Sequence, residues 1–192
     1  KHAVVQLEQG LDQMIWPGQS HLYLGLAQTA FGQPEKAEIN YQISLNDRPS
    51  FEAHLALAES ALNKRNFSVA ESHLEVVRNC RPVLGFIHQE NFLRGLMLVR
   101  QGRLDSAREV FLQLLREDPN QHRALLGLGY LETLQDHPKG AKAFYKKAVE
   151  VIDSQIADFH NNPTEESAAF LVRLKQNRLV AGKALNSLEP RP

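Results

Sequence analysis

Small and apolar residues recur along this chain at a nearly constant interval. The clearest markers are four alanines in the same local context, namely Ala37, Ala70, Ala107 and Ala141, which stand roughly 34 residues apart. An aromatic residue or a leucine follows each alanine by four positions, so that both lie on one face of a helix. Twelve positions before the alanines stand four more small residues, Gly25, Ala58, Gly95 and Gly129. The pattern predicts four pairs of helices, packed closely at these small residues.

The positions of the prolines agree with this division into helix pairs. Pro34 and Pro138 fall at the first turn of a predicted second helix, where the missing N–H has no cost. The predicted joints between helix pairs hold the other prolines of the patterned region, namely Pro17, Pro49, Pro82, Pro119 and Pro163. No proline therefore interrupts a predicted helix.

The pattern resembles the tetratricopeptide repeat, a helix-turn-helix unit of about 34 residues with small side chains at its eighth and twentieth positions. Four consecutive units match in register, at 18–51, 51–84, 88–121 and 122–155. The resemblance implies an all-α fold, a right-handed solenoid of helix pairs. It departs from the family at the fourth position, where the consensus tryptophan is replaced by His21, His54, Asn91 and Leu125. We expect this change to alter the stacking of the units and leave the fold unchanged.

Both ends of the array carry further predicted helices. Residues 1–17 place Ala3, Leu7 and Leu11 on one helical face, as in the second helix of a unit whose first helix is absent. An ordinary leading helix that packs on the first unit fits equally well. Residues 156–192 extend the last helix and then start a new one at Asn162 and Pro163, which predicts a helix over 163–188. This helix either caps the array, as solenoids require, or folds into the groove described below.

Composition narrows the class of partner. Lys+Arg and Asp+Glu number 22 each in the 192 residues, which gives a net charge of zero, with a sequence pI near 7.3. This balance argues against nucleic acid and against an anionic membrane surface as partners. We also expect no membrane insertion, because the uncharged stretch 13–34 contains Pro17 and Gly18 and several polar side chains. The single cysteine, Cys80, cannot form an internal disulfide, so the fold depends on packing.

Catalytic and metal-binding patterns are missing from the sequence. The eight histidines include no His-Glu-x-x-His motif, and Gly127-Leu128-Gly129 lacks the third glycine of a dinucleotide loop. His21 and His54 occupy equivalent positions of adjacent units, and buried packing is favoured over a pH sensor for this pair. We therefore expect no enzyme activity, no cofactor, no metal and no small-molecule substrate.

The resemblance also implies where a partner binds. In this family the first helices line a concave face, and the matching positions here are mostly apolar, unlike the basic and amide residues of members that hold a chaperone's carboxylate. The predicted groove residues are Leu22, Leu26, Leu55, Glu59, Phe92, Leu96, Arg100, Leu126 and Tyr130. For Leu22, Leu55, Phe92 and Leu126, a place in the core between repeats is an equal alternative.

Two functions follow from these observations. The first is a non-enzymatic scaffold that binds a hydrophobic or amphipathic protein segment in the concave groove. The alternative is a structural subunit that associates with itself, or that forms part of a longer repeat array in a multiprotein complex. The sequence favours the cytoplasm over a bacterial periplasm, because it has a single cysteine.

Overall fold

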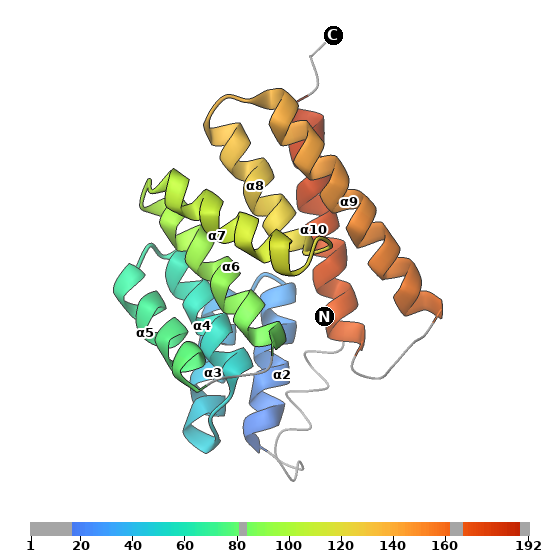
Figure 1. The fold of residues 1–192 in the computed structure, drawn as a ribbon. Coiled ribbons are helices and arrows are strands. Elements are labelled where there is room, and N and C mark those ends of the chain that lie inside the picture. The colour runs from blue at the N-terminus through green and yellow to red at the C-terminus, as the bar shows by residue number, and fades with distance from the viewer. Residues whose placement is uncertain (1–16, 81–83, 162–166, 189–192) are drawn as a thin grey trace. The chain divides into compact units, whose positions relative to one another are not determined.

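The computed structural model describes residues 17–80, 84–161 and 167–188, which form nine helices and no strand (Figure 1). In chain order these are α2 (Pro17–Ala30), α3 (Pro34–Asp47), α4 (Phe51–Asn63), α5 (Phe67–Asn79), α6 (Leu84–Arg100), α7 (Leu104–Glu117), α8 (His122–Leu134), α9 (Pro138–Asn161) and α10 (Ser167–Ser187). The all-α prediction is confirmed. The predicted leading helix in 1–17 lies outside the described residues apart from Pro17, as does the expected helix start at Asn162 and Pro163.

The chain divides into two compact units, residues 1–93 and 94–192, with the boundary inside α6. In the first unit, α2 packs on α3, α3 on α4, and α4 on α5. One core cluster joins the first three of these helices through Leu22, Ala37, Tyr41, Ala53 and Leu57. The small alanines in this cluster allow the helices to approach closely, so each helix covers the apolar face of its neighbour.

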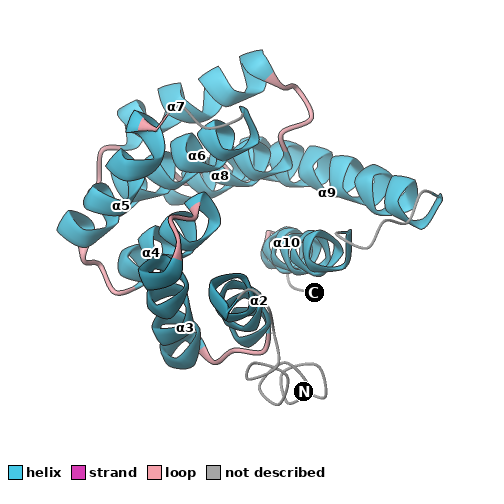
Figure 2. Cartoon of the chain, turned by 90° about the horizontal axis from the view of Figure 1, so that it is seen from below, coloured by secondary structure: helices cyan, strands magenta, loops and turns pink. Residues whose placement is uncertain are grey.

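The second unit continues the pattern of antiparallel pairs and ends in an added helix. Here α7 packs on α8, α8 on α9, and α10 on α9 (Figure 2). Fully buried Leu174 and Ala181 form the inner face of α10. Two polar contacts fix the helix further: Asn177 lies 3.1 Å from the His122 imidazole of α8, and Arg178 pairs with Asp153 of α9 at 2.9 Å.

Each turn within a helix pair ends the first helix in the same way. The second residue after the helix has a positive φ in all four turns, namely Gly32 at 72°, Arg65 at 56°, Gly102 at 76° and Asp136 at 57°. The N–H groups of this residue and of the next one donate to carbonyls in the last turn of the helix, for example Gly102 to Val99 at 3.0 Å and Arg103 to Leu98 at 2.9 Å. This is a Schellman cap, which satisfies carbonyls that a helix end otherwise leaves unpaired.

The small residues of the first helices receive aromatic rings from the second helices. A Cβ added at Gly25 would lie 2.6 Å from the Tyr41 ring, and one added at Gly129 would lie 2.8 Å from the Tyr145 ring. Phe111 is enclosed by two glycines, because added Cβ atoms at Gly95 and Gly127 would lie 2.4 and 2.7 Å from its ring. The two glycines of α8 are therefore explained by packing, because Gly127 leaves room for the Phe111 ring and Gly129 for the Tyr145 ring.

Candidate protein-binding surface and junctions between repeats

All predicted groove residues lie on the first helices of their pairs, but they differ in exposure. Leu22 is 9% exposed within the core cluster and Leu55 is fully buried, so the core alternative describes these two side chains. Leu26 of α2 is half-buried and packs against the same cluster. Glu59 of α4 is exposed. In the first unit, little apolar surface therefore remains at the predicted positions.

In the second unit the predicted positions keep more surface. Leu96 and Arg100 of α6 and Leu126 of α8 are half-buried, and Tyr130 of α8 is 45% exposed. Phe92, which lies on the part of α6 that belongs to the first unit, is also half-buried. These side chains are partly accessible on an ordered helix, which is the state expected of contact residues on a preformed surface.

Two exposed apolar side chains on the first helices were missed by the sequence reasoning. Tyr23 of α2 is 47% exposed and Leu134 of α8 is 48% exposed. Leu134 stands at the thirteenth position of its unit, directly after Thr133. The family uses this position for ligand contact, so the repeat register could have identified Leu134. Tyr23 falls at a position that the register does not assign to the groove.

Charge differs between the two units. The first holds 7 basic and 10 acidic residues, and the second holds 15 basic and 12 acidic residues. The first helices follow this division: Glu52 and Glu59 are exposed on α4, whereas Arg100 and Arg123 are half-buried on α6 and α8. The zero net charge of the chain is therefore the sum of an acidic first unit and a basic second unit.

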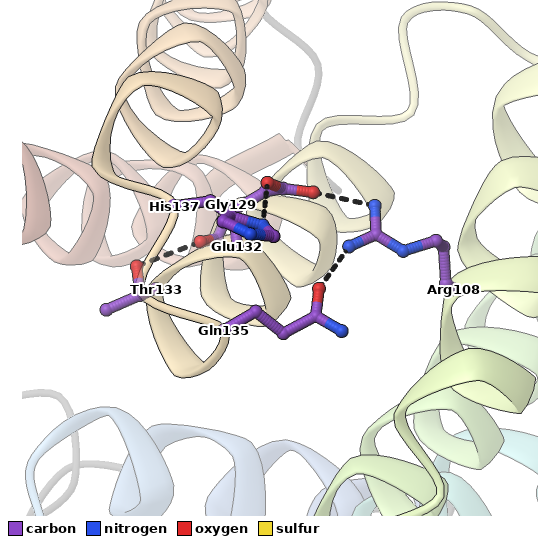
Figure 3. Close-up of polar contacts among 6 residues, drawn as sticks. All are labelled: Arg108, Gly129, Glu132, Thr133, Gln135 and His137. Atoms are coloured by element: carbon purple, nitrogen blue, oxygen red, sulfur yellow. Dashed lines mark hydrogen bonds and ion pairs between the residues drawn. The ribbon is translucent and has the colours of Figure 1, made fainter.

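A polar cluster joins α7 to α8 (Figure 3). The Arg108 guanidinium pairs with the Glu132 carboxylate at 2.7 Å and also donates to the side chain of Gln135. The other carboxylate oxygen of Glu132 lies 3.2 Å from the His137 imidazole in the following turn. Glu132 is only 12% exposed at its side chain, so this cluster links two successive helix pairs through a carboxylate that is largely shielded from water.

The first unit has an equivalent junction with the charges reversed. Glu38 of α3 stands one position after Ala37, as Arg108 stands one position after Ala107. Its carboxylate pairs with Lys64 and accepts from the Ser60 hydroxyl at 3.2 Å, both near the end of α4. Lys64 and Gln135 occupy the same position of their repeats. The same pair of positions therefore joins neighbouring repeats in both units, through an acid in one case and a base in the other.

His21 and His54 each pair within their own repeat. His21 Nδ1 lies 2.6 Å from Asn40 Oδ1, and the Asn40 amide donates onward to Gln28 at 2.9 Å in a buried chain of polar groups. His54 Nδ1 lies 2.9 Å from His73 Nδ1, with the ring centroids 5.2 Å apart. Burial lowers the pKa of both His54 and His73, which favours the neutral pair and hence one donor facing one acceptor.

His122, at the start of α8, is the most strongly perturbed histidine among the described residues. Burial, with a smaller contribution from the Arg123 charge, lowers its pKa to about 4. A neutral imidazole accepts the hydrogen bond that Asn177 of α10 donates. The contact between α10 and the last helix pair thus depends on an uncharged His122.

Neither a metal cluster nor a membrane-spanning helix occurs in the described ranges. Residues 17–80, 84–161 and 167–188 contain no group of three or more His, Cys, Asp or Glu side chains arranged to hold a metal ion. Within the same ranges, no helix combines the length and the apolar character that crossing a membrane requires.

Comparison with known proteins agrees with this architecture. A family model described as "Tetratricopeptide repeat" matches residues 92–156, from α6 to α9. One similar solved structure, a thermophilic TPR protein of Thermus thermophilus, has 19% identity and a TM-score of 0.59 over 88% of this chain and 99% of its own. A second, described as "MamA MSR-1 C2", has 24% identity and a TM-score of 0.51 over 80% of this chain and 87% of its own. The search of curated proteins gave no match.

The fold is thus a helical solenoid of the tetratricopeptide type. The family-model match over residues 92–156 and the two solved structures support the resemblance to tetratricopeptide repeat proteins. This fold suggests a protein–protein interaction scaffold.

Proposed function

We propose that this protein is a non-enzymatic scaffold whose first helices bind an amphipathic protein segment. The proposal depends chiefly on one observation: α8 exposes Tyr130 and Leu134 by nearly half of their surface, at positions that the family uses for contact. Full burial of a large exposed side chain contributes about 1.5 to 3 kcal/mol, and about half of that remains available at Tyr130 and Leu134 because each is already half-buried. The apolar anchors therefore position the segment, and measurable affinity also requires polar contacts.

Charge defines the segment more closely. Arg100 and Arg123 stand on the same two helices as Leu96, Leu126 and Tyr130, in the unit with the excess of basic residues. A helical segment with an apolar stripe and acidic flanking residues satisfies both features, because its stripe covers the leucines and the tyrosine while its carboxylates meet the arginines. The acidic residues Glu52 and Glu59 on α4 disfavour the same segment in the first unit.

The test begins with selection of binders from a displayed library of amphipathic helical peptides. The best peptide is then titrated by fluorescence anisotropy against the wild-type chain and against Leu96→Glu with Tyr130→Glu. We expect the double variant to weaken binding at least tenfold and the selected peptides to be rich in Asp and Glu. Circular dichroism of the variant confirms that it remains folded.

Val76→Glu is the matched control, because Val76 is 40% exposed on α5, a second helix. It introduces a charge at a similarly exposed apolar site away from the first helices. Equal binding by the wild type and the double variant, or equal loss with Val76→Glu, would contradict the proposed surface. Selection of basic peptides would contradict the proposed partner chemistry.

A further inference from the structure

The second repeat brings two imidazoles together between its helices. His54 of α4 and His73 of α5 have their Nδ1 atoms 2.9 Å apart, with the ring planes inclined by 50°. The next residue in the chain is fully buried in each case, Leu55 after His54 and Leu74 after His73, and α4 packs directly on α5. The backbone that carries each ring is therefore held in place, while the rings themselves are half-buried.

A hydrogen bond between the helices does not require two imidazoles. In the first repeat the equivalent positions hold His21 and Asn40, whose side chains lie 2.6 Å apart. The equivalent pairs of the third and fourth repeats are Asn91 with Val110 and Leu125 with Phe144. Only the second repeat thus places a histidine on both helices. A second imidazole adds a nitrogen that can bind a metal ion, which the amide of Asn40 does not offer.

The separation of the two Nδ1 atoms matches that of two ligands on one metal ion. Imidazole nitrogen binds first-row divalent metals at about 2.0 to 2.1 Å. Two such ligands at a right angle are about 2.9 Å apart, and tetragonal Cu²⁺ and Ni²⁺ sites have this angle. A tetrahedral Zn²⁺ site would require about 3.3 Å. The observed 2.9 Å therefore favours Cu²⁺ or Ni²⁺ over Zn²⁺.

The surroundings of the pair are compatible with a bound cation. Burial lowers the pKa of His73, and the Glu38 carboxylate acts in the opposite direction, so the ring is neutral while the nearby charge favours a cation. Binding requires the two rings to turn until both Nδ1 lone pairs point at the ion. The broad χ2 range of histidine permits this turn, and each ring then carries its proton on Nε2.

We propose that His54 and His73 bind one Cu²⁺ or Ni²⁺ ion between α4 and α5. The ion replaces the hydrogen bond between the two rings and links the two helices of the second repeat. In the part of the chain that the structure describes, no group of three His, Cys, Asp or Glu side chains forms a metal site, so water or a partner's side chain takes the other positions of the ion. The spacing of 19 residues fits no ligand motif, so the sequence did not indicate this pair.

Isothermal titration calorimetry of the full chain with Cu²⁺ or Ni²⁺ alone tests the proposal. His73→Asn is the diagnostic variant, because it restores the pair found in the first repeat and keeps a hydrogen bond between the helices. We expect it to lower the affinity of the tightest site at least tenfold, with circular dichroism unchanged. His160→Gln is the matched control, since it removes an exposed histidine of α9, and it should leave that site intact. Mg²⁺, which prefers oxygen ligands, should not bind the pair.

Electron paramagnetic resonance identifies the ligands directly. With less Cu²⁺ than protein, the tightest site fills first, and we expect nitrogen splitting from two imidazoles in the wild type. His54→Asn and His73→Asn should each lose this two-nitrogen signal. Equal affinity of the wild type and His73→Asn overturns the proposal, as does equal loss with His160→Gln or a signal that both variants retain. These measurements use no peptide ligand, so their failure leaves the groove proposal standing.

Discussion

His54 and His73 face each other across α4 and α5 with their Nδ1 atoms 2.9 Å apart. The first repeat fills the same two positions with His21 and Asn40, whose side chains are also hydrogen-bonded. The pair of positions is thus a polar bridge between the two helices of a repeat, with a histidine on the first helix in both cases. Its partner on the second helix is either an amide or an imidazole.

We expect His73→Asn to change the free energy of unfolding at pH 7.5 by less than about 1 kcal/mol, because it converts the bridge into the form found in the first repeat. His73→Leu is expected to cost about 1 to 3 kcal/mol, since it leaves the His54 ring without its partner in a half-buried site. Urea unfolding followed by circular dichroism measures both values. A larger loss for His73→Asn than for His73→Leu would show that hydrogen bonding does not stabilise this contact.

Acid is expected to weaken the attachment of α10. The folded-state pKa of His122 is lowered to about 4, so the unfolded chain binds a proton more readily below the ordinary value of 6.5. Stability is therefore fully present above about pH 6.5 and is lost as the pH falls toward 4, by about 1 to 3 kcal/mol after allowance for relaxation of the site. Urea unfolding at several pH values tests the sign.

His122→Gln is the diagnostic variant for this acid effect, because it keeps an acceptor for Asn177 but does not titrate. We expect its stability to depend less on pH between 6.5 and 4 than that of the wild type. His160→Gln is the control, since His160 is exposed at the end of α9. An equal flattening of the pH profile by both variants would remove His122 as the cause.

Two turns are expected to gain stability from glycine. Arg65 and Asp136 adopt positive φ values of 56° and 57°, where a side chain is strained, while the equivalent Gly32 and Gly102 carry no such cost. Arg65→Gly and Asp136→Gly should each stabilise the fold by about 0.5 to 1 kcal/mol. Thermal unfolding measures the gain. The reciprocal Gly102→Ala, which has open space around its Cβ, should destabilise by a similar amount through backbone strain alone.

Close packing at the small residues can be tested by exchanging pairs between repeats. Gly129→Ala brings a Cβ to 2.8 Å from the Tyr145 ring and is expected to cost about 1 to 3 kcal/mol. In the second repeat, the positions equivalent to Gly129 and Tyr145 hold Ala58 and Leu74. Adding Tyr145→Leu to Gly129→Ala should therefore recover part of the loss, and a double-mutant cycle should give a favourable coupling. Strict additivity of the two changes would argue against direct contact.

The sequence predicted the helix pairs well because their packing is local and periodic. Ala107 is fully buried, and the glycine twelve positions before it lies against Phe111, as spacing alone indicated. Exposure of the groove residues was less predictable, because Leu55 and Leu126 occupy equivalent positions yet only Leu55 is fully buried. That difference depends on neighbouring side chains, which the repeat period does not specify.

Contacts between polar groups were the least predictable part. The repeat register places His21 and His54 at equivalent positions but does not indicate their partners, and the structure pairs His54 with His73, 19 residues further along the same repeat. The His122 contact with Asn177 spans 55 residues and joins a repeat to the added helix, where the period no longer applies. Such pairs depend on the direction of side chains, which spacing in the sequence leaves open.

The reversed charges at the two junctions restrict the order of the repeats. Glu38 precedes Lys64 in one unit, and Arg108 precedes Gln135 and Glu132 in the other. If the helix pair containing Arg108 were followed by the one containing Lys64, two cations would meet at the junction. At these two junctions the second helix and its successor are matched in charge, so exchanging the two successors would replace favourable polar contacts with contacts between like charges.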